Sequence, residues 1–309
     1  MRVLITGAGG FVGRHLVTAL RAAYPGIVLI ETGLRLDAGA VEPLDITDFD
    51  AVRAKFAAAR PDFCFHLAAI SAVSLARAAP ERSWAVNLHG SLAVARAILD
   101  AAPGCGLIFA STSEIYGASF RNGKPLDEQA LLAPMNLYAA TKAAADLALG
   151  AMENDGLRVV RLRPFNHIGP GQDTAFAIAS FARQIAAIEA GSTKPELMVG
   201  NLDAYRDFLD VRDVVDAYAL CLRHFDQLKG QVLNIASGHA TRIGDVLQSL
   251  IGESTAPRID VTIDPTRLRG PEITHAIGDA SRARALLGWQ PRTPLRQTLA
   301  DMLAWSRAH

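Results

Sequence analysis

The sequence predicts an α/β protein, in which a doubly wound parallel sheet is joined to a smaller α+β lobe. Three observations support this class. Short apolar runs alternate with helical patterns through the first half of the 309-residue chain. A glycine-rich turn follows the first run, and the alternation weakens after Pro164. Continuous apolar strands separated by helices are typical of a parallel sheet that helices cover on both faces.

Hydrophobic periodicity defines the elements of the first half. The strand candidates are short and rich in β-branched and aromatic residues, and they are Val3–Thr6, Ile27–Glu31, Phe63–Leu67, Leu107–Ser111 and Val159–Leu162. The helix candidates between them carry apolar residues at a helical period, and they are Phe11–Ala22, Phe49–Ala59, Ser83–Ala101 and Leu137–Glu153.

The second half is expected to form a smaller, more interrupted lobe. A helical stripe is formed by Ile178, Phe181, Ile185 and Ile188. The candidates that follow it are a strand at Leu197–Val199, a helix at Asp213–Leu222, a strand at Val232–Ile235 and a C-terminal helix near Leu295–Arg307. Some of these elements are expected to return to the main sheet.

Composition and charge argue against several classes of protein. The charges of the 31 basic and 31 acidic side chains cancel, so the formal net charge is zero. A neutral chain argues against a broad positively charged surface for binding nucleic acid or an anionic membrane. Cys64, Cys105 and Cys221 are odd in number and widely spaced, so we expect free core thiols. No apolar run is long enough to span a bilayer, and no signal peptide precedes the first strand candidate. These features predict a cytoplasmic protein.

A glycine turn joins the first predicted strand to the first predicted helix. Gly7, Gly10 and Gly13 stand at a G-x-x-G-x-x-G spacing. Glycine permits a tight turn and lets the backbone approach a pyrophosphate closely. The helix that follows presents N–H groups and the positive end of its dipole to such an anion. The turn therefore predicts a dinucleotide site, with a plain structural turn as the alternative.

The second strand candidate bears on the choice between NAD and NADP. It ends at Glu31, and an acid at that position accepts hydrogen bonds from the adenosine ribose and repels a 2′-phosphate. Arg35 is close enough in the sequence to bind a 2′-phosphate instead, and either charge can also be an ordinary loop residue. The sequence leans towards NAD and leaves NADP open.

A tyrosine and a lysine are spaced for proton transfer. Tyr138 and Lys142 are four residues apart in a strongly helical stretch, so their side chains share one face. We expect the ammonium to lower the pKa of the phenol towards neutrality. Such a tyrosine exchanges a proton with a carbonyl oxygen while a hydride moves at carbon. Thr112, at the carboxyl end of a strand candidate, is expected to hydrogen-bond the same oxygen.

Together these motifs resemble the extended short-chain dehydrogenase/reductase family, whose members act on nucleotide-activated sugars. The matching segments cover most of the chain, and they are TGAGGFVG (6–13), LDITD (44–48), HLAA (66–69), STSEIYG (111–117), YAATK (138–142) and RPFNHIGPGQ (163–172). The resemblance implies a Rossmann-type sheet, NAD or NADP as cofactor, and Thr112, Tyr138 and Lys142 as the catalytic set. It implies that the cofactor is also lined by Phe11, Val12, Leu67, Ala68, Ala69 and Pro164, with Asp45 and Ile46 beside the adenine.

Three later segments narrow the substrate by the same resemblance. FNHIGPGQ (165–172), VGNLDAYRDFLDVRDVVDAY (199–218) and DPTRLRGPEI (264–273) are most similar to GDP-4-keto-6-deoxy-mannose reductases, which form GDP-rhamnose. The similarity implies substrate contacts from Ser113, Asn166, Gln184, Lys194, Arg206, Arg269 and Glu272, of which Asn166, Arg206 and Arg269 meet the diphosphate. Gly270 and Pro271 separate Arg269 from Glu272, which departs from the family pattern. A surface pair of Arg206 with Asp207 or Asp210 is the alternative.

Glu114 keeps a second reaction open. Thr-Ser-Glu ahead of Ile-Tyr-Gly also resembles GDP-mannose 4,6-dehydratase, in which the glutamate removes a C5 proton. A carboxylate that anchors the neighbouring loop is the structural alternative. A C4 epimerase is a further candidate, and a nucleotide-sensing relative without chemistry is the non-enzymatic hypothesis. Cofactor use separates the enzymes, because a reductase consumes its cofactor whereas dehydratases and epimerases retain it.

The resemblance also bears on domains and assembly. We expect a dinucleotide-binding domain at 1–163 with about 200–235, and a nucleotide-sugar-binding lobe at 164–199 and 236–309. The helices at 83–101 and 137–153 are rich in small residues, which the family uses for a four-helix bundle in a homodimer; an ordinary core face is the alternative. His167 has no His or Cys partner at ligand spacing, so we expect it to line the pocket or to bond locally, and no metal to be bound.

Overall fold

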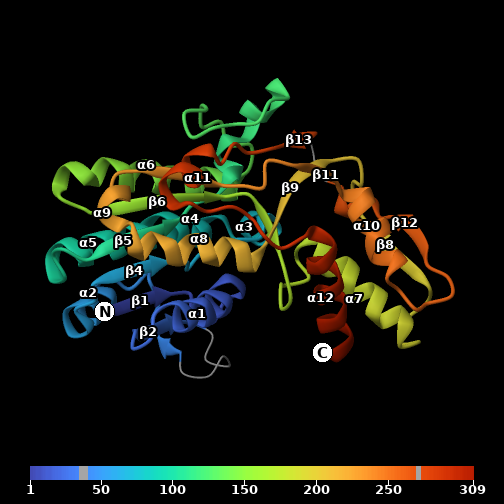
Figure 1. Cartoon of the computed structure of the whole chain (residues 1–309), viewed down its shortest axis with the longest axis horizontal. Coiled ribbons are helices and arrows are strands. Elements are labelled where there is room, and N and C mark those ends of the chain that lie inside the picture. The colour runs from blue at the N-terminus through green and yellow to red at the C-terminus, as the bar shows by residue number, and fades with distance from the viewer. Residues whose placement is uncertain (35–40, 269–272) are drawn as a thin grey trace.

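A seven-stranded parallel sheet is the largest element of the protein (Figure 1). The computed structural model describes residues 1–34, 41–268 and 273–309. In spatial order the strands are β10 (Val232–Ile235), β6 (Val159–Pro164), β5 (Gly106–Ala110), β4 (Phe63–His66), β1 (Arg2–Thr6), β2 (Val28–Gly33) and β3 (Glu42–Pro43). Strand order reverses between β1 and β4, which is where ligands bind in such sheets. The predicted doubly wound sheet is confirmed.

Helices cover both faces of this sheet. One face carries α1 (Phe11–Ala23), α8 (Val211–Arg223), α9 (Phe225–Leu228) and α11 (Ser281–Leu287), and the other carries α2 (Phe49–Ala59), α5 (Ser91–Ala101) and α6 (Leu137–Ala151). Successive residues of β1 point to opposite faces, as a strand requires. Val3 and Ile5 pack with the first set of helices, and Leu4 packs with the second.

The predicted helix at Ser83–Ala101 is interrupted, which corrects the sequence-based expectation. After the short α3 (Val73–Ala78), the chain forms α4 (Pro80–Trp84), a π-helical turn η1 (Ala85–Gly90) and then α5. A Cβ on Gly90 would lie 2.6 Å from Ile46 Cδ1. Asn87 Oδ1 accepts a hydrogen bond from the backbone nitrogen of Ile70 at 2.8 Å. A π-helical turn holds one residue more than an α-helical turn. Here it lies where the helix makes these tertiary contacts, and hydrophobic periodicity in the sequence does not reveal such contacts.

A second sheet and three longer helices form the smaller lobe, on the right of Figure 1. The sheet contains β7 (Asn166–Ile168), β9 (Tyr205–Asp210), β11 (Ala240–Arg242) and β13 (His275–Ala276), and a separate pair is formed by β8 (Glu196–Val199) and β12 (Asp260–Ile263). The helices are α7 (Ala177–Glu189), α10 (Ile243–Gly252) and α12 (Leu295–Ala308), which enclose a third apolar core. Sequence analysis missed β7, β9, β11, β12 and β13, because they are short and most carry polar side chains.

The segment 200–235 contributes to both sheets. Strand β9 lies at the centre of the second sheet, whereas α8 and β10 pack in the large one. Helix α11 belongs to the later segment 236–309, yet it packs against β10 and α8. The chain therefore passes between the two lobes more than once. These connections hold the β10 edge of the large sheet to the second sheet.

The cysteines are buried and none forms a disulfide, as expected. Burial raises the pKa of the Cys105 thiol to about 12, with Asp62 acting in the same direction. Within the described part of the chain, no helix combines the length and the apolar character that a bilayer crossing requires.

Candidate active site

The turn between β1 and α1 requires glycine at two positions. Gly7 has a left-handed φ of +77°, and a Cβ on it would lie 2.8 Å from the backbone nitrogen of Ala68. A Cβ on Gly13 would lie 2.4 Å from the carbonyl oxygen of Gly7. Helix α1 begins at Gly10, which has no side chain to cap its first N–H groups. Those groups are therefore available to an anion.

The other residues expected at the cofactor lie around this turn. Phe11 and Val12 form the first turn of α1, and Leu67, Ala68 and Ala69 directly follow β4. Pro164 ends β6 on the same edge of the sheet. Because the carboxyl ends of parallel strands share one edge, these residues surround the crevice at which the strand order reverses.

Glu31 does not end the second strand, which corrects the expectation from sequence. Strand β2 continues for two more residues to Gly33. The Glu31 carboxylate pairs with Arg21 of α1 at 2.6 Å. The acid is therefore paired with a neighbouring helix in this structure, and its contact with an adenosine ribose stays a prediction. Arg35 lies outside the described residues.

Asp45 and Ile46 follow the short strand β3 and have different surroundings. Asp45 Oδ1 accepts hydrogen bonds from Thr47 N at 2.9 Å and Thr47 Oγ1 at 2.7 Å, and Oδ2 pairs with Arg82 at 3.1 Å. Burial opposes the effect, but these contacts hold the pKa of Asp45 below its ordinary value. The Ile46 side chain is buried against Gly90. Asp45 thus fixes the loop, while Ile46 supports it from the core.

Thr112, Tyr138 and Lys142 converge at the carboxyl end of β5. Thr112 is the residue at which the 3₁₀ helix η2 (Ser113–Asn122) begins. Tyr138 and Lys142 lie on α6, which begins at Asn136, whose Oδ1 accepts from the backbone nitrogen of Ala139 at 2.8 Å. The Thr112 hydroxyl lies close enough to the Tyr138 phenol to lower the pKa of that phenol. The side chains expected to share one carbonyl oxygen are therefore neighbours.

The expected acidification of Tyr138 by Lys142 was wrong. Burial raises the pKa of Tyr138 to about 12, the nearby Thr112 hydroxyl opposes this only in part, and the Glu114 carboxylate adds to the rise. Lys142 is directed elsewhere, because its Nζ donates to the Ala110 carbonyl oxygen at 2.6 Å. The phenol in this arrangement keeps its proton at neutral pH.

Lys142 is itself buried, with 3% of its surface exposed. Burial lowers its pKa to about 7, and the Asp146 carboxylate opposes that shift. The Nζ atom lies 4.2 Å from the centre of the Phe109 ring, a contact that favours the ammonium form. The charge of Lys142 near neutral pH therefore depends on its immediate surroundings.

Glu114 anchors the loop that precedes α6. Its Oε2 accepts a hydrogen bond from Asn136 Nδ2 at 3.2 Å, and Asn136 is the residue that caps α6. Ser113 is buried one residue earlier, at the start of η2. The alternative to a catalytic role was that Glu114 anchors the neighbouring loop, and its hydrogen bond with Asn136 is a contact of that kind.

His167 lies in β7 beside the glycine turn. Its ring stacks on Phe11, with centroids 6.3 Å apart and planes at 4°. Its Nδ1 donates to the carbonyl oxygen of Phe165 at 2.9 Å, and burial lowers its pKa. His167 therefore bonds locally, which is one of the two roles expected of it. Asn166, the first residue of β7, pairs with Phe208 of β9.

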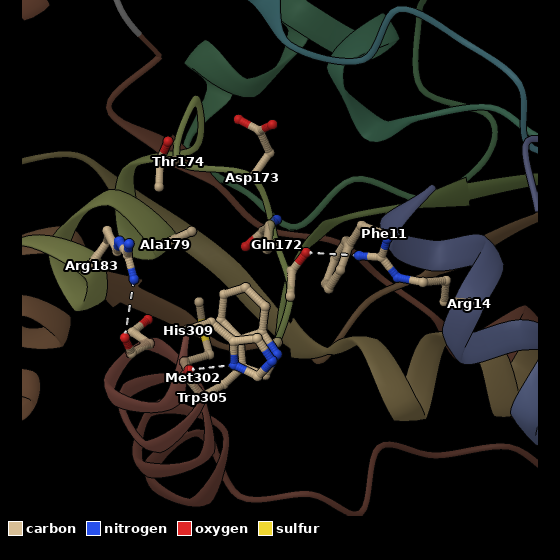
Figure 2. A pocket seen from close by; sticks show the side chains of 13 residues that line it. Phe11, Arg14, Gln172, Asp173, Thr174, Ala179, Arg183, Met302, Trp305 and His309 are labelled. Carbon is tan, nitrogen blue, oxygen red and sulfur yellow. Dashed lines mark hydrogen bonds between the residues drawn. The ribbon is translucent and has the colours of Figure 1, made fainter. Parts of the chain in front are cut away.

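A cavity of about 350 Å³ opens between the start of α1, the loop at 169–174, α7 and α12 (Figure 2). Figure 2 shows Arg14 donating to the carbonyl oxygen of Gly171 at 3.2 Å on one side. On the other side, Arg183 donates to the carbonyl oxygen of Ser306 at 3.2 Å. The catalytic set does not line this cavity, so we do not assign it to the reaction.

Two of the expected substrate residues lie around β8. Gln184 Oε1 accepts from the backbone nitrogen of Met198 at 2.9 Å, and its Nε2 donates to the carbonyl oxygen of Met198 at 3.2 Å. This amide holds α7 to β8, so Gln184 is no longer assigned to the substrate. Lys194 is exposed in the turn between those elements. Arg269 and Glu272 lie outside the described residues.

Arg206 lies in β9, at the centre of the second sheet. Its Nη1 donates to two backbone carbonyl oxygens, each at 2.9 Å. The two carboxylates considered as its partners are engaged with other groups. Asp207 accepts from Ser237 N at 2.8 Å, and Asp210 Oδ2 pairs with Arg212 at 2.7 Å.

A buried charged pair behind the catalytic set was missed by sequence analysis. Asp146 on α6 accepts hydrogen bonds from Arg163 of β6, at 2.8 Å from Nη2 and 3.1 Å from Nε. The spacing of Asp146, four residues after Lys142, places both on one helix face and could have identified it. Nothing in the sequence alone pairs Asp146 with Arg163, because that contact needs the strand and the helix to be packed together.

Comparison with known proteins agrees with this arrangement. The family model described as GDP-mannose 4,6 dehydratase matches residues 4–302. The chain is 34% identical to the GDP-6-deoxy-D-mannose reductase of Pseudomonas aeruginosa, over 98% of this chain and 96% of the relative. It is 28% identical to the GDP-6-deoxy-D-talose 4-dehydrogenase of Aggregatibacter actinomycetemcomitans, over 98% and 97%.

The structure of RMD from Pseudomonas aeruginosa complexed with NADPH has a TM-score of 0.88 and 32% identity to this chain. The match covers 100% of this chain and 99% of that one. The sequence match extends over nearly the whole chain, and the strand order agrees with the expected fold. The protein therefore belongs to the GDP-mannose 4,6-dehydratase family of extended short-chain dehydrogenases/reductases.

Proposed function

We propose that this protein is a reductase that transfers a hydride from NADPH or NADH to the C4 keto group of a nucleotide-linked 4-keto-6-deoxy-hexose. The proposed substrate is GDP-4-keto-6-deoxy-mannose and the proposed product is GDP-rhamnose. The observation that carries the proposal is the convergence of the Thr112 hydroxyl, a protonated Tyr138 phenol and Lys142 at the carboxyl end of β5. Reduction needs a proton donor at the carbonyl oxygen. The 34% identity to a GDP-6-deoxy-D-mannose reductase supports the choice of sugar and base.

The residues around the glycine turn fit a nicotinamide dinucleotide. Gly7 and Gly13 leave space that a Cβ would fill, and the open start of α1 suits a pyrophosphate. A dinucleotide bound there supplies the hydride. Tyr138 gives its proton to the C4 oxygen, and the Thr112 hydroxyl donates a hydrogen bond to the same oxygen. Lys142, one helical turn away and bonded to the Ala110 carbonyl oxygen, is proposed to contact the nicotinamide ribose.

The decisive experiment follows cofactor oxidation. Purified protein is mixed with GDP-4-keto-6-deoxy-mannose and either NADPH or NADH, and absorbance of the reduced nicotinamide is recorded. We expect one cofactor to be oxidised for each sugar reduced, and NMR of the product to give the configuration at C4. Both cofactors are needed because Glu31, which favoured NAD in the sequence, is paired with Arg21. Turnover of GDP-mannose without added cofactor would contradict the reductase assignment.

A dehydratase or a C4 epimerase with bound NAD or NADP is the alternative, and Glu114 separates the dehydratase from the reductase. In a reductase that uses Glu114 only as an anchor, Glu114→Gln should keep kcat within about threefold, because a glutamine oxygen can still accept from Asn136. A dehydratase would lose its C5 base, and turnover of GDP-mannose would fall about 100-fold or more. Both reactions are measured on the same preparation. Glu81→Gln, on the exposed start of α4, is the control.

The smaller lobe is proposed to hold the nucleotide sugar. The segments 164–199 and 236–309 carry most of it, with Asn166 and Arg206 as proposed contacts of the diphosphate, and Ser113 and Lys194 as further contacts. Arg269 and Glu272, which the resemblance adds to this set, lie outside the described residues. Guanidinium groups bind phosphate oxygens in a paired geometry. The free thiols favour a reducing compartment, so we propose a cytoplasmic location.

A homodimer formed by α5 and α6 is also proposed. The buried alanines of α6, such as Ala139 and Ala145, belong to the core of the subunit. The outer face of these helices carries Leu92 and Leu147, and Leu147 is 58% exposed. Leu147→Glu should convert a dimer to a monomer in light scattering at micromolar concentration. Leu131→Glu, at a loop position that is 76% exposed, is the control, and a monomeric wild type would exclude the dimer.

A further inference from the structure

Three buried side chains share one face of α6. Tyr138, Lys142 and Asp146 recur every four residues, and they are 9%, 3% and 0% exposed. Lys142 contacts the end of β5 through the Ala110 carbonyl oxygen. Asp146 contacts β6 one turn further along the helix. The face that carries the proton donor therefore continues into a buried acid that the proposed reaction does not use.

Asp146 is held by two arginines of β6. Its Oδ1 accepts from Arg163 Nη2 at 2.8 Å and from Arg161 Nη1 at 3.2 Å, and its Oδ2 accepts from Arg163 Nε at 3.1 Å. Burial alone would raise the pKa of Asp146, but the bonds and charge of Arg163, aided by Arg161, bring it below its ordinary value. Asp146 is therefore a fixed negative charge that is bonded to two arginines and lies one helical turn from Lys142 on the same face of α6.

Arg163 also reaches the turn that carries Thr112. Its Nη1 donates to the Tyr116 hydroxyl at 3.1 Å, and Tyr116 in turn donates to Asn234 Oδ1 at 2.7 Å. Tyr116 lies in η2, the 3₁₀ helix that begins at Thr112. One guanidinium thus bonds α6 through Asp146 and the Thr112 turn through Tyr116.

We propose that Asp146 and Arg163 are positioning residues for the reduction: Asp146 keeps Lys142 charged, and Arg163 holds α6 against the turn of Thr112. Neither residue is placed against the reacting atoms, so they act through Lys142 and Tyr116. The inference rests on the proposed function for its effect on catalysis. Its electrostatic part can be measured without any substrate.

The groups that face Lys142 show why Asp146 matters. From β4 comes His66, whose pKa is lowered to about 3 by burial and by the Lys142 charge, so it is neutral. From β5 come the Ala110 carbonyl oxygen and the Phe109 ring. Tyr138, on the same helix, is also neutral because its pKa is about 12. Asp146 therefore supplies the negative charge that offsets the cost of burying the ammonium.

The direct test is a titration of Lys142 by NMR of protein labelled with ¹³C at lysine Cε. The other lysines, Lys55, Lys124, Lys194 and Lys229, serve as internal references, and Lys142→Arg identifies the signal. In Asp146→Asn the midpoint of Lys142 should fall by about one unit, since a close opposite charge shifts a pKa by about 1–3 units. In Asp146→Glu it should stay within about half a unit. A Lys142 midpoint unchanged in Asp146→Asn would overturn the proposal.

Folding of the variants is controlled by a double variant. Removing one member of a buried ion pair is costly, whereas removing both is often tolerated. Asp146→Asn combined with Arg163→Gln is therefore used if a single variant does not fold in circular dichroism. Because Asp146 shares a helix face with Lys142, whereas Arg163 belongs to the neighbouring strand, the Lys142 midpoint should still fall, by about half a unit. An unchanged midpoint in the double variant would contradict the proposal equally.

The kinetic test separates positioning from general damage to the fold. In the wild type, reductase activity should decline as pH rises through the Lys142 midpoint. In Asp146→Asn that decline should occur about one unit lower, so kcat/KM at pH 7 falls about fivefold and recovers at lower pH. Arg163→Gln should lower kcat without moving the decline to lower pH. A loss in Asp146→Asn that is equal at every pH would show a structural role only.

The two tests also separate this inference from the proposed function. If the wild type does not oxidise NADPH in the presence of the keto-sugar, the reductase assignment fails. The Lys142 titration would still report whether Asp146 keeps the ammonium charged. If instead the wild type is active and Lys142 does not respond to Asp146→Asn, the inference fails alone.

Discussion

Tyr138→Phe should lower kcat for reduction of the keto-sugar by about 10²–10⁴-fold. The phenol is buried, lies near the Thr112 hydroxyl and is protonated at neutral pH, so its removal takes away the proton donor and leaves the ring in place. Affinity for NADPH, measured by nicotinamide fluorescence, should stay within a few-fold, because the glycine turn is untouched. Stopped-flow absorbance of the reduced nicotinamide measures the loss.

Tyr24→Phe is the matched control for this prediction. The Tyr24 hydroxyl donates to the carbonyl oxygen of Ala219 at 2.7 Å, at the far end of α1 from the crevice. Its loss should cost about 1 kcal/mol of the free energy of unfolding and leave kcat unchanged. If Tyr138→Phe also retained kcat within a few-fold, the assignment of Tyr138 as proton donor would fail.

Gly7→Ala should abolish measurable binding of the dinucleotide and lower the free energy of unfolding by about 3 kcal/mol. The added Cβ would lie 2.8 Å from Ala68 N and 2.9 Å from Ala68 Cα, where only backbone can move aside. The ends of β1 and β4 would be forced apart at the crevice, and the start of α1 would shift with them. Fluorescence titration with NADPH and urea unfolding measure the two effects.

Gly26→Ala separates backbone strain from the steric clash. Gly26 has nearly the same φ, +80°, but no heavy atom lies within 4 Å of a Cβ built on it. The variant should therefore show only the left-handed strain of about 1 kcal/mol and bind the dinucleotide normally. Equal losses in the two variants would mean that the close approach of Gly7 to Ala68 is unimportant.

Much of the fold could be predicted from local patterns. The helix at Phe49–Ala59 has the predicted bounds, and the strand at Val232–Ile235 does as well. In both elements the buried positions follow the period of the helix or strand, so the spacing of apolar residues predicts the element correctly. The prediction of one continuous helix at Ser83–Ala101 fails because Gly90 packs against the Ile46 side chain and Asn87 bonds to the Ile70 backbone. Both neighbours are distant in the sequence.

In the candidate site, the positions of the residues could be predicted from the sequence, but their charges and hydrogen-bond partners could not. Thr112 could be placed near Tyr138 because parallel topology brings strand ends and the following helices to one edge. The charge states could not be predicted: spacing on a helix puts Lys142 near Tyr138, but the Ala110 carbonyl oxygen and the buried Asp146 decide its direction and protonation. Gln184 likewise needed the structure, since its amide bonds to β8.

By itself, the sequence determined the parallel sheet, the glycine turn and the identity of the residues that meet at the carboxyl end of β5, because strand and helix periods are local properties. Only the tertiary structure decided which groups are desolvated and which partners they face. Desolvation and these partners determine that Tyr138 keeps its proton, how strongly Lys142 holds its charge, and that Glu31 pairs with Arg21. Burial and long-range pairing depend on residues far apart in the chain, and no spacing within one segment records them.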